Sequence, residues 1–289
     1  MQKVQKMKRF AVILALAFCS LSLTAKTGLV VIAHGSPSKE WNRNVLEIEK
    51  KLQKADIPGI SYVRVALMEF AQPNIASVIR DCEKEGIDTV FALPLFISPS
   101  GHSEDDVPNI LGLKYDPRVH SELVEENTEF VHTGIRIVEG PTLINSGVIE
   151  KAMVERIKAL SKNPASEAIV LLAHGDPGRS GFWKHILNKC EASIRDAGFN
   201  YVDCTLVGMG QNLAEDIKPL LEKAQSSKER VLVQGIYLQS SVHSMARMAG
   251  MTGKSAGSIV YGTEGILPKS SDEVCEWIVK TTSEWLVER

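Results

Sequence analysis

An internal repeat limits the architectures that this chain can adopt. The segment Leu29–Pro37 reads Leu-Val-Val-Ile-Ala-His-Gly-Ser-Pro, and Ile169–Pro177 reads Ile-Val-Leu-Leu-Ala-His-Gly-Asp-Pro. Each copy is a continuous apolar run that ends in His-Gly, and such a run is typical of a strand buried on both faces of a parallel sheet. The repeat therefore predicts a chain built from two similar halves.

A second pair of histidines follows at matched spacing. His102 lies 68 residues after His34, and His243 lies 69 residues after His174. Each of these later histidines also follows an apolar run, so each half carries a histidine after two different strands. Four unrelated histidines would rarely be spaced in this way, and the repeated placement therefore indicates function.

Strand-like and helix-like patterns alternate along both halves, which predicts the α/β class with a mainly parallel sheet in each half. The repeat divides the chain into lobes at residues 27–144 and 145–289. Ligands of such sheets bind beyond the carboxyl ends of the strands, where all four histidines would lie. The expected strands are Leu29–Ala33, Tyr62–Met68, Thr89–Ile97, Phe130–Val138, Ala168–Ala173, Tyr201–Val207, Val231–Leu238 and Ser258–Tyr261. Helices are expected between these strands, at about Asn145–Leu160, and at Asp272–Leu286, while Leu111–Thr128 reads as polar and turn-rich.

The first 25 residues read as a secretion signal. They hold four basic residues and no acidic one, followed by the apolar run Phe10–Cys19 and a small-residue exit that ends at Ala25. The run is short for a membrane span, so we expect cleavage after Ala25, no stable span in the mature chain, and a periplasmic or other extracytoplasmic location. The alternatives are an uncleaved anchor and lipidation at Cys19, where the preceding Phe18 is larger than the usual small residue.

Composition argues against some partners. Beyond residue 25 the chain carries 29 basic and 35 acidic residues, with no basic stripe, so no nucleic acid is expected. Gly250–Gly257 contains Gly-Lys-Ser without the spacing of a phosphate-binding loop, so no nucleotide is expected either. The cysteines of the mature chain are scattered and give no thiolate metal signature, although an oxidising compartment would permit a disulfide. They are Cys82, Cys190, Cys204 and Cys275.

In the first half, chemistry-bearing side chains follow three successive strands. His34 follows the first strand, Glu69 ends the second, and His102 follows the third, trailed by the acidic run Glu104–Asp106. Two imidazoles and a carboxylate suit a divalent first-row metal with open coordination positions, and they can also transfer protons near neutral pH. Each residue alone has an ordinary explanation: a histidine bonded to a carbonyl, a solvated glutamate, or acidic residues at a helix start.

The second half keeps the histidines and loses the carboxylates. The position 35 residues after His174 is Met209, and His243 is followed by Met245–Arg247 in place of the acidic run. His174 and His243 are therefore secondary candidates, and Met209 is expected to pack rather than to bind metal. Phe182 and Trp183 either line a cleft for a flat aromatic ligand or pack in the core.

These motifs resemble a known family. The stretch Ala33–Pro37, Glu69 with Pro73, and Pro94–Pro108 are similar to the class II tetrapyrrole chelatases, the sirohydrochlorin cobaltochelatases of the CbiX and CbiK type and their ferrochelatase relatives. The resemblance covers nearly all of the chain after the signal. It implies two flavodoxin-like lobes related by duplication, with a metal inserted into a flat macrocycle in the cleft between them.

By motif match, the resemblance implies that His34, Glu69 and His102 form the catalytic and metal-binding set. The implied activity is lyase-type insertion of a divalent metal into a tetrapyrrole such as sirohydrochlorin, as in cobalamin biosynthesis. Co²⁺ is favoured, and Fe²⁺ and Ni²⁺ are the other candidates. Arg64 and Arg179 are the candidates for binding the carboxylates of such a substrate.

Export does not fit cytoplasmic corrin synthesis, so an alternative stays open. It is an exported protein that binds a tetrapyrrole, haem or a metal, or removes a metal, without biosynthetic turnover. A homo-oligomer is compatible with either function.

Overall fold

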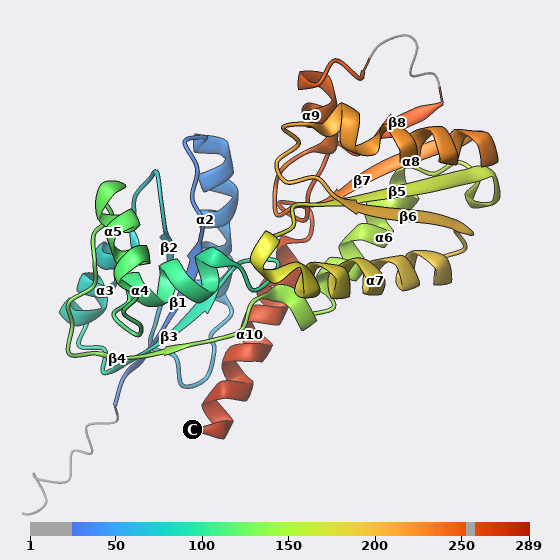
Figure 1. The fold of residues 1–289 in the computed structure, drawn as a ribbon. Helices are drawn as coiled ribbons and strands as arrows, with labels where there is room; N and C mark the ends of the chain where they lie inside the picture. Colours follow the sequence, from blue (N-terminus) through green and yellow to red (C-terminus); the bar gives the residue numbers. More distant parts are fainter. Residues whose placement is uncertain (1–24, 253–257) are drawn as a thin grey trace, which may run out of the picture.

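The computed structural model describes residues 25–252 and 258–289, which form two lobes, each built on a four-stranded sheet (Figure 1). The strand order is β2-β1-β3-β4 in the first sheet and β6-β5-β7-β8 in the second. Neighbouring strands are parallel throughout. The predicted α/β class and the duplicated parallel sheets are confirmed. The expected secretion signal lies almost entirely outside the described residues, as does most of the Gly-Lys-Ser turn.

In the first half, strands alternate with helices, and a π-helical turn follows β3. The elements are β1 (Thr27–Ala33), α2 (Lys39–Lys54), β2 (Tyr62–Leu67), α3 (Ile75–Lys84), β3 (Thr89–Pro94), the π-helical turn His102–Asp106, α4 (Val107–Ile110), α5 (Pro117–Glu125) and β4 (Arg136–Glu139). We call the π-helical segment the His102 turn. A 3-10 turn, Leu143–Asn145, and α6 (Val148–Leu160) lead into the second half.

The second half repeats the alternation of strands and helices. Its elements are a 3-10 turn (Pro164–Ser166), β5 (Glu167–Ala173), a 3-10 turn (Pro177–Arg179), α7 (Ser180–Asp196), β6 (Tyr201–Leu206), α8 (Leu213–Ser227), β7 (Arg230–Ile236), α9 (Val242–Met248), β8 (Ile259–Tyr261) and α10 (Ser271–Glu288).

The repeated apolar runs are the central strands β1 and β5, in which every residue is buried. Burial on both faces explains why these strands show no polar alternation. Parallel pairing sets Ala33 beside Leu67 and Ile32 beside Pro94. The carboxyl ends of β1, β2 and β3 therefore meet at one edge of the first sheet, and the loops that follow them start side by side.

The last helix crosses back to the first lobe, and Figure 1 shows α10 running between the two sheets. Trp285 of α10 stacks on Phe91 of β3, with ring centroids 4.4 Å apart and planes 8° apart. In contrast, α6 packs in the second lobe, where its buried Arg156 donates to the carbonyl oxygens of Gly265 and Ile266. The last helix of the second half thus packs on the first sheet. The division of the chain into lobes at residues 144 and 145 stays a prediction.

Two local expectations were wrong. The expected strand Phe130–Val138 is limited to Arg136–Glu139, because Phe130 stacks on His120 and the Val131 amide donates to Ile110, so this stretch packs on α4 and α5. The turn-rich stretch contains the helix α5, which begins at the N-cap Asp116 and buries Val119 and Leu123.

All four described cysteines are free thiols, and Cys82 and Cys190 are buried as expected for small apolar side chains. Across residues 25–252 and 258–289, every helix is too short or too polar to cross a membrane.

Candidate metal site

His34 follows β1 directly and is held by its own neighbour. Its Nδ1 atom lies 2.9 Å from the carbonyl oxygen of Gly35. A carbonyl oxygen only accepts hydrogen bonds, so Nδ1 is the donor in this contact and Nε2 is the ring atom left to bind a metal. The backbone geometry after β1 therefore fixes the orientation of the His34 ring and leaves Nε2 as its ligand atom.

Glu69 is tied to the same loop through the backbone. The Glu69 amide donates to the His34 carbonyl oxygen at 2.8 Å, which continues the pairing of β1 and β2 by one residue. Gly35 has a φ of +88°, and a Cβ atom there would lie 2.1 Å from the Glu69 carbonyl oxygen. Glycine at position 35 thus lets the segments that follow β1 and β2, which carry His34 and Glu69, approach each other closely. No other residue type at this position permits that approach.

His102 begins the His102 turn and is oriented by a carboxylate one helical turn later. Its Nδ1 lies 2.7 Å from Oδ2 of Asp106. Burial alone would lower the pKa of His102, but the hydrogen bond with Asp106 and the negative charges of Asp106 and Glu69 outweigh it and raise this pKa. A carboxylate on the far nitrogen fixes the tautomer and ring orientation of a metal-binding histidine, which leaves Nε2 as its ligand atom.

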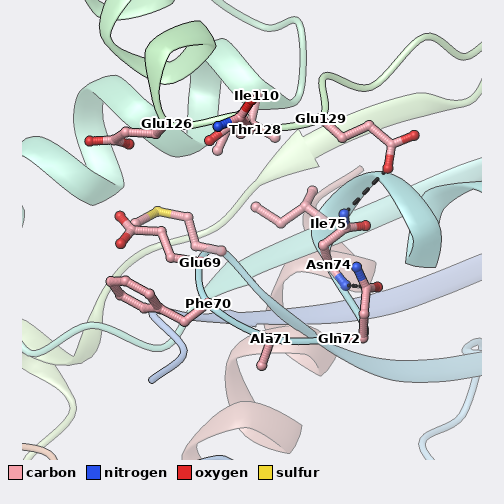
Figure 2. Close-up of a pocket in the computed structure, with 12 residues that line it drawn as sticks. Glu69, Phe70, Ala71, Gln72, Asn74, Ile75, Ile110, Glu126, Thr128 and Glu129 are labelled. Atoms are coloured by element: carbon pink, nitrogen blue, oxygen red, sulfur yellow. Dashed lines mark hydrogen bonds between the residues drawn. The ribbon is translucent and has the colours of Figure 1, made fainter. Parts of the chain in front are cut away.

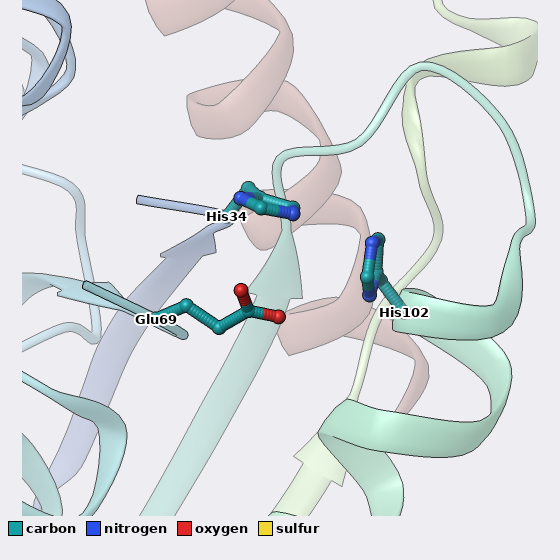
Figure 3. A group of neighbouring side chains, drawn as sticks. All are labelled: His34, Glu69 and His102. Carbon is teal, nitrogen blue, oxygen red and sulfur yellow. The ribbon is translucent and has the colours of Figure 1, made fainter. Parts of the chain in front are cut away.

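The structure brings the three predicted residues together (Figure 3). One ligand atom from each of His34, Glu69 and His102 lies within 4.8 Å of the other two. The two imidazole rings meet edge to face, with centroids 4.7 Å apart. All three side chains are partly buried, and each comes from a different strand end. Two nitrogen donors and one carboxylate form a set that suits a divalent first-row metal and leaves coordination positions for a substrate.

A cavity of about 500 Å³ adjoins this group and has Glu69 in its wall (Figure 2). Glu126 and Glu129 line it as well, and Glu129 is neutralised by Arg80. The pKa of Glu126 is raised by partial burial and by the negative charges of Glu69 and Asp106. Glu69, Asp106 and Glu126 therefore give the metal site a negative field that favours a dication.

The acidic run after His102 divides into different roles. Asp106 orients His102, whereas Asp105 is bound by Lys114 and by Arg179, each at 2.6 Å. Glu104 is exposed, and its charge reaches the half-buried Glu139. Asp106 was not assigned to His102 from the sequence, although the i,i+4 spacing of the two residues within a helical turn was the signal that could have done so.

The histidines of the second half are not members of this group. His174 repeats the local geometry of His34, with its Nδ1 atom 2.6 Å from the Gly175 carbonyl oxygen. His243 lies in the first turn of α9, and its amide donates to Gly262. Among the residues that the structure describes, His34, Glu69 and His102 form the one group of three that could hold a metal ion.

Other residues expected near a ligand differ in placement. Arg64 lies within β2, where its guanidinium contacts Glu49 and Asp81, and Arg179 is bound to Asp105, so both are already paired with carboxylates. Met209 is 49% exposed, so the expectation that it packs was wrong. Trp183 is buried, in agreement with core packing, whereas Phe182 is 44% exposed and does not pack in the core.

An aromatic side chain that the sequence did not single out lies at the site. Phe70 is 64% exposed, and its ring stacks on His34 with centroids 6.0 Å apart. An exposed aromatic face beside a metal-binding group is a surface on which a flat ligand can stack.

The first half of the chain is similar in sequence to known proteins. Residues 28–160 match the family model described as CbiX. The chain is 35% identical over 85 residues to a sirohydrochlorin cobaltochelatase of Methanococcus maripaludis, a match that covers 29% of this chain and 58% of that protein. It is 30% identical over 83 residues to a chloroplastic sirohydrochlorin ferrochelatase of Arabidopsis thaliana, covering 29% of this chain and 36% of that protein.

Solved structures match over both lobes. SirB from Bacillus subtilis with Fe³⁺ superposes with a TM-score of 0.65 at 19% identity, over 90% of this chain and 95% of that one. CbiX of siroheme biosynthesis in denitrifying bacteria gives a TM-score of 0.53 at 13% identity, over 87% and 97% of the two chains. At these identities the likeness concerns the fold.

The two-lobed α/β fold is similar to that of solved chelatases. The first half of the chain is similar to the CbiX family model and to curated sirohydrochlorin chelatases, the family that the motifs after the first three strands resemble. The chain spans 58% of the length of the first curated relative, so that protein's activity does not pass to this chain directly.

Proposed function

We propose that this chain is a metal chelatase that inserts a divalent metal, with cobalt favoured, into a tetrapyrrole such as sirohydrochlorin. The observation that carries the proposal is the convergence of His34, Glu69 and His102, whose ligand atoms lie within 4.8 Å of one another. Such a set binds a dication and keeps part of its coordination sphere open for the nitrogens of a macrocycle.

The chemistry needs two kinds of group. The Nε2 atoms of His34 and His102 hold the metal, because both Nδ1 atoms are already occupied. Insertion of M²⁺ into the macrocycle releases two pyrrole protons, and Glu69 is placed to accept or relay them. The carboxylates around the site favour both the incoming dication and the departing protons. The exposed ring of Phe70 offers the macrocycle a stacking surface beside His34.

The named relatives bear on the metal. They include both cobaltochelatases and a ferrochelatase acting on sirohydrochlorin, and the similar solved structures contain cobalt and Fe³⁺. We infer sirohydrochlorin as the substrate class and Co²⁺ as the favoured metal, with Fe²⁺ and Ni²⁺ as the competitors to test.

We also propose that the chain acts outside the cytoplasm, because residues 1–25 read as a secretion signal; cell fractionation tests this.

The test uses purified chain lacking only residues 1–25. Sirohydrochlorin and each metal ion in turn are added, and insertion is followed by the change in tetrapyrrole absorbance. We expect fastest turnover with Co²⁺, and a loss of at least about 100-fold in His34→Ala and His102→Ala, because each removes a metal ligand and even groups that only orient such ligands contribute about 10- to 100-fold. His174→Ala is the matched control and keeps activity.

Two results would contradict the proposal. Undiminished turnover in both first-half variants would remove the assigned site. Tight tetrapyrrole binding by the wild-type chain, with no change in metal content over hours, would favour an exported binding protein instead.

A further inference from the structure

The loop after the second His-Gly motif reaches across to the first lobe and contacts the His102 turn on both sides of His102. Oδ2 of Asp176 accepts a hydrogen bond from the Gly101 amide at 3.2 Å. Nη2 of Arg179 donates to Oδ2 of Asp105 at 2.6 Å. The residue before His102 and a residue three positions after it are therefore both held by the other lobe.

The two contacts form one connected group. Asp176 uses its other oxygen to accept from the Gly178 amide at 2.9 Å, which fixes its side chain at the start of the 3-10 turn. Nη1 of Arg179 lies 3.7 Å from Asp176. The side chains of Asp105, Asp176 and Arg179 are only 19% to 27% exposed, so these ion pairs are screened less than surface pairs.

The His102 turn has a local reason to need such support. Its π-helical bonding is rare and occurs mostly as single turns at functional sites. Within the first lobe, Lys114 binds Asp105 and Ser103 bonds to Ser100, but the side of the turn that faces the second lobe is held by Asp176 and Arg179.

The first half has different residues at the positions equivalent to Asp176 and Arg179. Asp176 stands where the first copy has Ser36, and Arg179 stands where it has Lys39. Ser36 makes a local bond instead, accepting from the Ser38 amide. The second copy thus has a carboxylate and a guanidinium where the first copy has a hydroxyl and an ammonium group.

We propose that Asp176 and Arg179 are positioning residues for the metal site, which brace the His102 turn so that the His102 ring faces His34 and Glu69. The second His-Gly loop then supports the metal site of the first half from the other lobe. This inference rests on the proposed function to the extent that His102 is a metal ligand. It assigns to the second half a role in metal binding that its own histidines do not supply.

The test is a Co²⁺ titration of the chain lacking residues 1–25, read by the visible absorbance of bound cobalt and needing no tetrapyrrole. We expect Arg179→Ala and Asp176→Ser to weaken Co²⁺ binding by about 10-fold, the low end of the loss on removing groups that orient metal ligands. Arg179→Lys should restore part of the affinity. In an Asp105→Asn background, Arg179→Ala should cost little more, because the two residues act as one pair.

The matched control is Gln239→Ala. Gln239 also joins the lobes, accepting from Asn44 and donating to the Trp41 carbonyl oxygen, each at 2.9 Å, and neither of these hydrogen bonds involves the His102 turn. It should leave Co²⁺ affinity unchanged. The melting temperatures of all variants should stay within about 4 °C of wild type, as expected for the loss of one partly exposed ion pair.

The outcomes separate this inference from the proposed function. If Arg179→Ala and Asp176→Ser bind Co²⁺ like wild type while His102→Ala does not, the brace is refuted and the metal site stands. Equal weakening in Gln239→Ala would refute it too, since general loosening of the lobes would explain the effect. If His102→Ala also binds normally, the proposed site itself fails. Should Arg179→Ala not fold, Asp176→Ser and Arg179→Lys decide.

Discussion

Nδ1 of His102 and Oδ2 of Asp106 lie 2.7 Å apart within a single turn of π-helix. This contact assigns the histidine its tautomer, turns its Nε2 atom into the ligand atom, and raises its basicity. We expect Asp106→Asn to weaken Co²⁺ binding by about 10-fold, because an amide holds the ring less firmly and adds no negative charge. A titration monitored by visible absorbance measures this, and Glu122→Gln, in an exposed pair on α5, is the control. Unchanged affinity in Asp106→Asn would show that the contact is incidental.

Gly35 permits the close approach of His34 and Glu69. Substitution by alanine imposes left-handed backbone strain and also places a Cβ atom 2.1 Å from the Glu69 carbonyl oxygen. We expect Gly35→Ala to lower the free energy of unfolding by at least about 1 kcal/mol and to abolish tight Co²⁺ binding. Gly86→Ala is a matched comparison, since Gly86 has a φ of +68° with nothing within 4 Å of an added Cβ. It should lose stability and keep Co²⁺ binding; equal loss of binding in both variants would refute the steric explanation.

Phe70 should matter for the macrocycle and not for the metal. Its exposed ring stacks on His34, so a tetrapyrrole bound there would cover it. Covering an aromatic ring contributes about 1.5 kcal/mol or more, and Phe70→Ala should weaken tetrapyrrole binding by about 10-fold while Co²⁺ affinity stays the same. Fluorescence or absorbance titration with sirohydrochlorin measures the change. Tyr115→Ala removes an exposed ring outside the group and serves as control; the same loss in both variants would argue against a specific contact.

Glu139 should make stability depend on pH. Burial, with a contribution from the negative charge of Glu104, raises the pKa of Glu139 to about 7, and one of its oxygens is buried without a hydrogen-bond partner. The folded state therefore keeps a proton that the unfolded state loses above its ordinary pKa of 4.5. The stabilisation is fully present below pH 4.5 and is lost as pH rises to 7.

Glu139→Gln removes this titration. Because the side chain is only partly buried, the discounted effect is on the order of 1 kcal/mol, with the variant more stable than wild type at pH 8 and similar to it at pH 5. Urea unfolding at the two pH values measures the difference. A pH-independent difference between the two proteins would contradict the assignment.

The fold could be predicted from the sequence largely because β1 and β5 are buried on both faces and therefore appear as continuous apolar runs. The repetition of this run with its His-Gly end identified the two halves. The site could be read because parallel strands bring the residues after β1, β2 and β3 to one edge. The helix α5 was missed since its outward face is polar, although Asp116 followed by Pro117 marks its start. The short β4 was overestimated because apolar residues from Phe130 onward pack on helices instead of pairing.

The partners of the site depend on tertiary geometry. The i,i+4 spacing of His102 and Asp106 was a local signal for their contact, but no apolar periodicity indicates the π-helical turn in which it forms. Arg179 meets Asp105 across 74 residues and between two lobes, so no local pattern could have indicated it. The same packing explains why Arg179 is not free to bind a substrate carboxylate.

The central claim is that the duplicated chain holds one metal site, formed by His34, Glu69 and His102. The most direct measurement is the stoichiometry of Co²⁺ binding in four single variants, with alanine at His34, His102, His174 and His243. The account predicts one tightly bound Co²⁺ per chain in the wild type, lost in the first two variants and kept in the last two. Two equivalent ions per chain, or loss of binding in His174→Ala with retention in His34→Ala, would contradict it.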